Sequence, residues 1–299
     1  MIDNASALVS VVIPTYNHAC YLGRALQSVL DQTYTNWEAI VIDNHSTDNT
    51  DEIIARFVDQ RITIYKIHNN GVIAVSRNVG IRAAKGEWVA FLDSDDWWTA
   101  DKLQVCFDCI NDKDDLVYHD LEIVIDHRRF FRRRKIKSWQ VKPPVLIDLL
   151  VKGNAIATSS TVVRKKFLTQ LKGMSESSDM VAAEDYNTWL RIAQLTDGFR
   201  YVSKRLGFYQ LHNQGSSRKD MSVSVRHAAA EFIDLLSSQQ KNKFEASLRY
   251  TVGRFNYLAG NYIEAKKELL LFLISDGQPI MALKSLWMIA AIFYLKYRR

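Results

Sequence analysis

The chain has 299 residues, of which 47% are apolar and 24% are charged, with only 12 glycines and 4 prolines. This composition excludes collagen-like and disordered classes, and it suits one large globular domain or a domain with a smaller appendage. The formal charge of +6 and the pI of about 9.1 favour anionic partners such as nucleotides, lipid headgroups or nucleic acid.

The cysteine count and the N-terminal residues indicate the cellular compartment of the chain. There are three cysteines and no secretory leader, which predicts a reduced, cytoplasmic chain. No stretch reaches the ~20 consecutive apolar residues of a membrane-spanning helix. Cys106 and Cys109 form a C-x-x-C pair without the second pair that a zinc site needs, so we expect both thiols on one buried helix face.

Short apolar runs alternate with stretches of helical spacing in the first third of the chain. The runs at 8–13, 37–42, 62–65 and 88–92 predict strands, and the stretches at 19–31, 46–57 and 72–84 predict helices. Such alternation indicates right-handed βαβ units and a mainly parallel, twisted sheet with helices on its faces. The predicted class is therefore α/β, and ligands are expected beyond the carboxyl ends of the strands.

Polar clusters occur at those carboxyl ends. Thr15-Tyr16-Asn17 follows the first strand, Asp43-Asn44 the second, and Asp93-Ser94-Asp95-Asp96 the strand at 88–92. Crowded carboxylates repel one another, whereas Mg²⁺ or Mn²⁺ accepts such oxygen ligands and keeps positions for substrate phosphates. The acidic cluster therefore predicts an enzyme that handles a nucleoside diphosphate.

Two other interpretations of the acidic cluster fit the sequence less well. A solvated turn is disfavoured because Trp97 and Trp98 follow directly. A phosphatase of the haloacid dehalogenase type would have Thr where Trp97 stands, and its motif usually lies near the N-terminus.

The regular alternation of predicted strands and helices becomes less clear after residue 99. Strands are predicted at 116–118, 121–125 and 156–163, and a helix at 185–193. After about residue 223 the chain is predicted to be helical to its end. Residues 257–265 resemble one helix–turn–helix unit of the tetratricopeptide kind, but no second copy is evident, which favours a helical hairpin packed on the preceding domain.

Five motifs occur in a characteristic order, at residues 11–17, 42–48, 76–80, 93–96 and 184–191. Together they make residues 8–215 resemble a family 2 glycosyltransferase with the GT-A fold. The resemblance implies inverting transfer of a sugar from a nucleotide sugar, with a divalent metal holding the diphosphate. It also implies a transferase domain over residues 1–222, which leaves residues 223–299 as a C-terminal helical region.

The resemblance assigns the metal and the chemistry to particular side chains. Asp95 is the first choice as metal ligand, with Asp93 as a second ligand or a ribose contact and Asp96 orienting a ligand. His212 resembles a residue near the donor diphosphate, although a lone histidine is more often structural. Asp185 is expected to act as the base that deprotonates the acceptor hydroxyl, supported by Glu184; the alternative is an ordinary acid at a helix N-terminus.

The resemblance also implies a binding site for the nucleotide. Tyr16 is expected to stack on the base, and Asn44 stands where the family usually has an Asp that accepts the base's ring N–H. This departure leaves base identity open, with uracil or thymine as candidates. Arg77 is expected to bind either a phosphate or a structural carboxylate such as Asp93. The complete set of expected donor contacts is Pro14, Thr15, Tyr16, Asn17, Asp43, Asn44, Arg77, Asp93 and Ser94.

Two segments suggest a partner. The basic run at 128–135 fits a solvated hairpin, a nucleic-acid patch, or contact with anionic lipid or a diphosphate acceptor; no nucleic-acid-binding signature supports the second. The apolar tail at 286–295 fits either an interfacial helix or packing within the helical region.

We therefore expect a peripheral enzyme on the inner face of the cytoplasmic membrane. It would act on a polyprenyl-diphosphate-linked glycan in surface polysaccharide synthesis, such as O-antigen or capsule. The rival hypothesis is an inactive, transferase-like scaffold that binds partners through its basic run and its helical tail.

Overall fold

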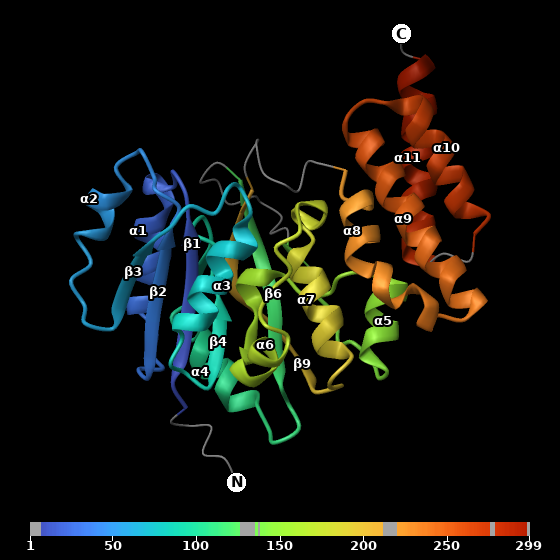
Figure 1. Ribbon diagram of the computed structural model, residues 1–299. Helices are drawn as coiled ribbons and strands as arrows, with labels where there is room; N and C mark the ends of the chain where they lie inside the picture. The colour runs from blue at the N-terminus through green and yellow to red at the C-terminus, as the bar shows by residue number, and fades with distance from the viewer. Residues whose placement is uncertain (1–6, 126–134, 137, 212–219, 276–278, 298–299) are drawn as a thin grey trace.

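The structure is a computed structural model that describes residues 7–125, 135–136, 138–211, 220–275 and 279–297. Figure 1 shows a twisted sheet with helices on its faces, and an array of C-terminal helices stacked beside it. The α/β prediction is confirmed, and the sheet is mixed rather than wholly parallel.

Nine strands form one sheet among the described residues, in the order β3-β2-β1-β4-β8-β6-β9-β5, with β7 paired to β6. The strands are β1 (Val9–Thr15), β2 (Trp37–Asp43), β3 (Ile62–Lys66), β4 (Trp88–Phe91), β5 (Trp97–Trp98), β6 (Leu116–Ile125), β7 (Lys135–Ile136), β8 (Val162–Arg164) and β9 (Phe199–Leu211). The pairs β1–β2, β2–β3 and β1–β4 are parallel, so their carboxyl ends meet at one edge.

Helices cover both faces of the sheet and then continue to the C-terminus. They are α1 (Ala19–Leu30), α2 (Thr50–Ile54), α3 (Ile73–Ala83), α4 (Lys102–Cys109), α5 (Val145–Lys152), α6 (Lys165–Gln170), α7 (Glu184–Ala193), α8 (Ser222–Ala229), α9 (Ser238–Leu258), α10 (Tyr262–Leu273) and α11 (Pro279–Tyr297). The 3₁₀ helices used below are η2 (Thr158–Ser160), η3 (Ser178–Met180) and η5 (Ala230–Leu235).

Strand β1 shows why the apolar runs of the sequence become central strands. Every residue of β1 is buried. Val11 and Ile13 belong to one hydrophobic core and Val12 to the core on the opposite face, because alternate side chains point to opposite faces. Helix α3 approaches β1 so closely at Gly80 that a Cβ there would lie 2.5 Å from Val12 Cγ1.

The second half of the sheet departs from the sequence predictions. Strands predicted at 116–118 and 121–125 are one strand, β6. The strand predicted at 156–163 is wrong for most of its length, because residues 158–160 form η2 and only Val162–Arg164 pairs with β4 and β6. Strand β9 was not predicted; it pairs parallel to β6 along its length.

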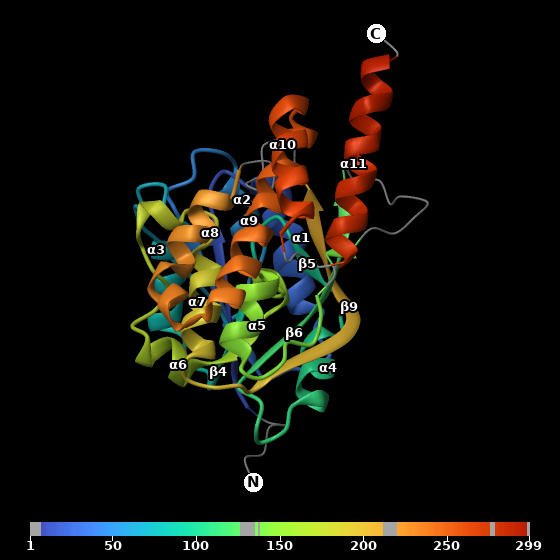
Figure 2. The ribbon, with the colours of Figure 1, turned by 90° about the vertical axis from the view of Figure 1, so that its right-hand side faces the viewer.

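The C-terminal region is helical wherever the structure describes it. Figure 2 shows α10 and α11 at the outer side of this region. Helices α9 and α10 are joined by a turn in which Gly260 has a φ of +81°, so the predicted helix–turn–helix is present. The domain boundary at 222/223 stays a prediction.

The cysteine prediction is half wrong. Cys106 is buried as expected, whereas Cys109 is exposed. Cys109 is the last residue of α4, and it is not among the buried residues of that helix.

Candidate active site

A cavity of about 560 Å³ opens at the carboxyl ends of the parallel strands. Its wall includes residues from all five sequence motifs, which lie far apart in the chain. The predicted site residues that line it are Pro14, Thr15, Tyr16, Asn44, Arg77, Asp93, Ser94, Asp95 and Glu184. The fold therefore gathers most of the predicted site around one hollow, as expected at this edge of a parallel sheet.

Asn17 and Asp43 do not line this cavity. Asn17 has a φ of +50°, its backbone N–H donates to Ser46 Oγ at 2.9 Å, and its side-chain oxygen accepts from the Thr47 N–H at 2.8 Å. Asp43 is fully buried and accepts from the hydroxyl and the N–H of Ser46. In this structure both residues hold the turn at 44–47 against the loop after β1.

The acidic loop divides its carboxylates between the cavity and the interior. Asp93 and Asp95 line the cavity, whereas Asp96 is buried and accepts from the Gln210 N–H at 2.9 Å. Burial raises the pKa of Asp96 well above its usual range, and the charges of Asp95 and Asp93 raise it further. Asp96 thus anchors the loop to β9.

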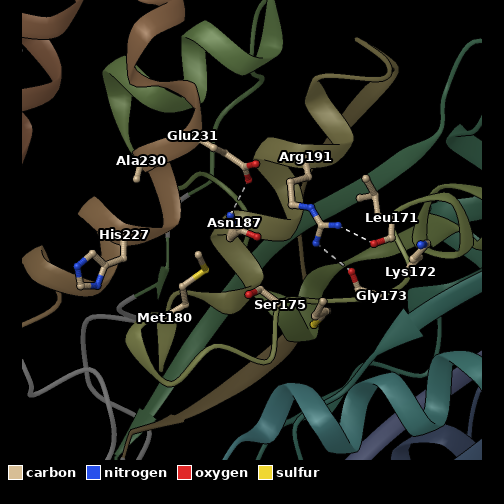
Figure 3. Close-up of a pocket in the computed structure, with 11 residues that line it drawn as sticks. Leu171, Lys172, Gly173, Ser175, Met180, Asn187, Arg191, His227, Ala230 and Glu231 are labelled. Carbon is tan, nitrogen blue, oxygen red and sulfur yellow. Dashed lines mark hydrogen bonds between the residues drawn. The ribbon is translucent and has the colours of Figure 1, made fainter.

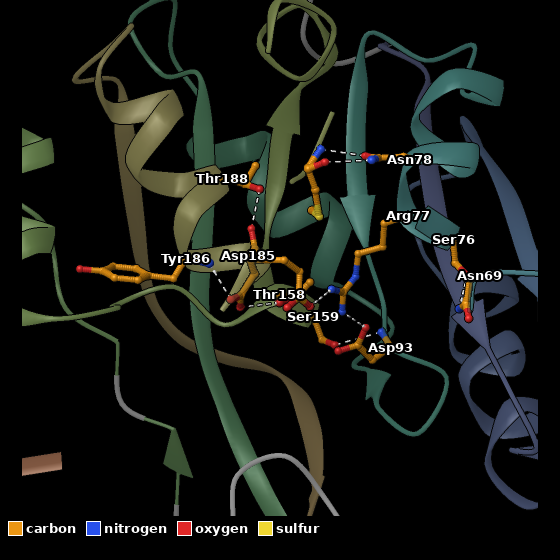
Figure 4. A network of polar contacts seen from close by, with 12 residues as sticks. Asn69, Ser76, Arg77, Asn78, Asp93, Thr158, Ser159, Asp185, Tyr186 and Thr188 are labelled. Carbon is orange, nitrogen blue, oxygen red and sulfur yellow. Dashed lines mark hydrogen bonds and ion pairs between the residues drawn. The ribbon is translucent and has the colours of Figure 1, made fainter. Parts of the chain in front are cut away.

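Arg77 joins the acidic loop to α7. Its side chain is 3% exposed, its Nη2 donates to Asp93 at 2.7 Å, and its Nη1 donates to Glu184 at 2.7 Å. Figure 4 shows the guanidinium of Arg77 beside Asp93. Burial alone would lower the pKa of Arg77, but the charges of Asp93 and Glu184 raise it above its ordinary value. Of the two expected roles, the structural ion pair is the one observed here.

The two ion pairs that Arg77 makes with Asp93 and Glu184 are called the Arg77 clamp below. Asp185 lies beside this clamp at the start of α7. It does not line the cavity; its Oδ2 accepts from Thr158 Oγ1 at 2.8 Å, and its Oδ1 accepts from the Tyr186 N–H at 2.6 Å (Figure 4). Burial raises the pKa of Asp185 to about 6, and the charge of Glu184 adds to the increase. The Thr158 hydroxyl, the Arg77 charge and the Tyr186 N–H act in the opposite direction.

Helix η2 was missed in the sequence analysis, and it connects the two acidic regions. Thr158 binds Asp185, while Ser159 Oγ accepts from the Asp93 N–H at 3.1 Å. The carbonyl of Ser159 also accepts from the Trp98 indole at 2.7 Å. The run Thr158-Ser159-Ser160 was the available indication, since three hydroxyl residues are unusual inside a buried strand.

His18 and Asn69 are two further residues of the cavity wall that the sequence analysis missed. His18 Nδ1 lies 2.9 Å from Ser94 Oγ. The Asn69 N–H donates to Asn44 Oδ1 at 2.8 Å, so the loop after β3 is fixed to the residue that follows β2.

The donor atoms of the cavity fit a hard divalent cation that has few protein ligands. Within the described ranges, no group of three or more His, Cys, Asp or Glu side chains is placed to bind a metal. Asp93 and Asp95 nevertheless present carboxylates on the cavity wall, and Mg²⁺ or Mn²⁺ commonly binds one or two carboxylates plus water and phosphate oxygens. The predicted ligand His212 lies outside the described residues.

A second cavity, of about 510 Å³, lies between α7, η5 and the segment after α6 (Figure 3). Arg191 crosses it to donate to the carbonyls of Gly173 and Leu171, and Asn187 donates to Glu231. These polar side chains are thus engaged within the chain, and they join the segment that precedes Glu184 to the C-terminal helices.

Comparison with protein families gives a match over residues 10–168 to the family described as Glycosyl transferase family 2. The putative teichuronic acid biosynthesis glycosyltransferase TuaG of Bacillus subtilis is 44% identical over 34% of this chain and 41% of its own length. The chain thus matches less than half of that relative. The Escherichia coli protein named UDP-Glc:alpha-D-GlcNAc-diphosphoundecaprenol beta-1,3-glucosyltransferase WfgD is 32% identical over 62% of this chain and 69% of its own.

Solved structures share the fold. The S. aureus protein TarS, crystallised with UDP-GlcNAc, superposes with a TM-score of 0.63 at 19% identity, over 97% of this chain and 91% of that one. The mannosyltransferase PcManGT from Pyrobaculum calidifontis, in complex with GDP-Man and Mn²⁺, gives a TM-score of 0.60 at 21% identity, over 97% and 81%.

Proposed function

Because the chain belongs to glycosyl transferase family 2, we propose that it transfers a sugar from a nucleotide sugar to an acceptor hydroxyl with inversion. The observation that carries this proposal is the Arg77 clamp. It joins Asp93, on the side of the cavity where the donor diphosphate would lie, to Glu184, next to the proposed base. One buried cation thereby fixes the distance between the donor side and the acceptor side of the site.

The donor occupies the cavity beyond β1 and β4. Tyr16, which is exposed on the wall, stacks on the base, and Asn44 lies within reach of the base edge. The E. coli relative is named for a UDP-sugar, and TarS was crystallised with UDP-GlcNAc, so uridine is the proposed nucleoside. Asp95, with Asp93, would hold Mg²⁺ or Mn²⁺, which supplies positive charge against the diphosphate leaving group.

Asp185 takes the proton of the acceptor hydroxyl as that oxygen attacks the anomeric carbon. Its raised pKa places it closer to neutrality than an ordinary carboxylate, which makes it a stronger base. Glu184 is paired with Arg77, so it positions the first turn of α7. Thr158 fixes the rotamer of Asp185 through the 2.8 Å hydrogen bond.

The proposed acceptor is a glycan linked to a polyprenyl diphosphate, at the inner face of the cytoplasmic membrane. Two E. coli relatives carry names that specify a diphosphoundecaprenol acceptor. Within the described part of the chain, no helix has both the length and the apolar character required to cross a bilayer. The names of these relatives support an acceptor that is met at the membrane surface.

Thermal unfolding with sugar nucleotides tests the donor. A UDP-sugar with Mn²⁺ should raise the melting temperature, since a ligand at about 100 times its Kd adds about 2.7 kcal/mol to the free energy of unfolding. Asp95→Ala should lose this increase, whereas Asp31→Ala, which removes an exposed acid directly after α1, should keep it. If no sugar nucleotide stabilises the protein with Mn²⁺ or Mg²⁺, the proposal is wrong.

Transfer to a synthetic lipid-diphosphate sugar tests the reaction itself. We expect a product whose new anomeric centre is inverted relative to the donor, as measured by NMR coupling constants. A product of retained configuration would contradict the single-displacement mechanism, and binding without any transfer would favour the scaffold hypothesis.

A further inference from the structure

The α10–α11 hairpin exposes apolar side chains away from the rest of the protein. Helix α11 packs inward through Ser285, Met288, Ile289 and Ile292, which are buried. Its opposite face exposes Ile280, Leu283, Leu286, Trp287 and Tyr294, with Leu283 70% and Trp287 66% exposed. These positions recur every three or four residues, so they form one stripe along the helix.

Helix α10 exposes apolar side chains as well. Ile263, Leu270 and Ile274 are exposed on one of its faces, and Ile274 is 83% exposed. Ile274 and Ile280 lie on either side of the connection between the two helices. Most large apolar residues of the described chain that are exposed lie between Leu258 and Tyr294. Soluble proteins rarely leave so much contiguous apolar surface uncovered unless it binds something.

The C-terminal helices, of which the hairpin is a part, carry the chain's excess positive charge, and residues 262–299 alone contain six lysines and arginines against three aspartates and glutamates. Residues 238–299 contain ten lysines and arginines against four aspartates and glutamates, whereas residues 1–237 contain 29 of each. Lys284 is exposed within the α11 stripe, and Lys266 Nζ lies 4.3 Å from the centre of the Phe293 ring. The net charge of +6 is therefore a property of this helical segment.

From the coincidence of these two properties we infer that the α10–α11 hairpin docks the protein on an anionic lipid bilayer, with the α11 stripe in the interface. This inference rests on the proposed function, since it names the surface that brings the enzyme to a lipid-linked acceptor. An interfacial helix presents apolar and aromatic residues to the acyl region and lysines to the headgroups, as α11 does.

The direction of α11 relates the proposed docking surface to the main cavity. Figure 1 shows the start of β1 toward one end of the molecule and the C-terminal end of α11 at the other. The carboxyl ends of β1 and β2, where the main cavity opens, therefore point toward the same side as the end of α11. A bilayer along the α11 stripe would run parallel to the helix, so the cavity would open beside the membrane surface.

A second copy of the chain is the competing occupant. A contact between two α11 stripes would bring together two copies of a segment that carries an excess of six positive charges. Anionic headgroups neutralise these charges, whereas a second copy adds to them.

Vesicle flotation of the full chain tests the inference. We expect binding to vesicles of phosphatidylglycerol and phosphatidylethanolamine, weak binding to phosphatidylcholine alone, and a decrease between 0.1 and 0.5 M salt. The double variant Leu283→Glu/Trp287→Glu should weaken binding roughly tenfold or more, because two apolar side chains leave the interface. The control variant Val58→Glu/Leu235→Glu introduces the same two negative charges at exposed apolar residues outside the hairpin. It should bind vesicles as the wild type does.

The outcomes separate this inference from the proposed function. Wild-type protein that stays off anionic vesicles overturns the inference, and so does an α11 variant that binds as tightly as its control. Light scattering that shows a dimer, lost in the α11 variant without any vesicle binding, assigns the stripe to a second copy. The increase in melting temperature with a UDP-sugar is measured on the same samples. If the UDP-sugar stabilises the protein but the protein does not bind vesicles, only the docking surface is refuted. If the protein binds vesicles but no UDP-sugar stabilises it, only the proposed transferase function is refuted.

Discussion

Two buried cations in this protein have opposite surroundings. Arg77 lies between Asp93 and Glu184, 2.7 Å from each. Lys102 is fully buried at the start of α4, where its Nζ lies 3.8 Å from the centre of the Trp98 ring and has no hydrogen-bond partner among the described residues. Accordingly the pKa of Arg77 is raised, whereas burial lowers the pKa of Lys102 to about 8. The comparison teaches that burial alone does not identify a functional charge; the partners do.

Breaking the paired cation should have the largest effect. Arg77→Met leaves two carboxylates without their partner, so we expect a loss of about 3–5 kcal/mol in the free energy of unfolding and loss of transfer activity. Urea unfolding and a transfer assay measure the two effects. Arg82→Met, on the exposed face of the same helix, is the matched control and should change neither. A stable, active Arg77→Met protein would remove the clamp from the proposed mechanism.

Removing the base that lies beside the clamp should affect the chemistry and leave the donor in place. Asp185→Asn keeps the shape of the side chain and abolishes its basicity, so kcat should fall by about 10²–10⁴. The melting-temperature increase with a UDP-sugar and Mn²⁺ should stay as in the wild type. Unchanged kcat would reassign the base, with Glu184 as the first alternative to examine.

Removing the unpaired cation should stabilise the protein. Lys102→Met fills the same space without a buried charge, so we expect a gain of about 1–4 kcal/mol at pH 7. In the folded wild type the pKa of Lys102 is about 8, whereas its ordinary value, which we take for the unfolded chain, is 10.5. Between these pH values the unfolded chain holds a proton that the folded chain has released, so stability should rise with pH there.

Urea unfolding from pH 7 to 10.5 measures this rise. It should be absent in Lys102→Met and present in the exposed control Lys113→Met. A Lys102→Met protein that is less stable than the wild type at pH 7 would show that the ammonium has a partner that compensates its burial.

Loosening the support of Asp185 should give the smallest effect. Thr158→Val removes a hydrogen bond that lowers the pKa of Asp185, so the acid limb of the kcat profile, centred near pH 6, should move to higher pH. The base must be deprotonated, so activity falls below that limb. One hydrogen bond is worth about 1 kcal/mol, and the loss should be greatest near pH 6. Thr158→Ser should restore the wild-type profile, and a limb that does not move would limit Thr158 to a structural role.

The parallel half of the sheet could be predicted from local pattern. The strands at 9–15, 37–43 and 88–91 are mainly apolar, and polar residues follow each of them within two positions; the strand at 62–66 contains β-branched residues. Because parallel strands end at one edge, most of the predicted site residues meet there. This part depends on periodicity within each element, which the sequence contains.

The rest depends on contacts between distant residues. Asp96 turns inward because the backbone of Gln210, 114 positions later, donates to it. Residues 156–163 contain β-branched residues at both ends, which favours a strand, yet the hydroxyls of Thr158 and Ser159 bind Asp185 and the Asp93 N–H instead. No local pattern contains these partners, so the roles of Asp96 and η2 could not be predicted.

Helix α9 belongs to two separate hydrophobic clusters. Phe244 and Leu248, in its first half, join the main core that also holds α5 and α7, whereas Tyr250 and Tyr257 pack against the small cluster of α10 and α11. The main hydrophobic core therefore extends into the first half of α9, past the change from sheet to helices. A chain cut at residue 222 would lose Phe232 and Phe244 from its main core, whereas a chain that ends after α9 would keep them and lose only the hairpin.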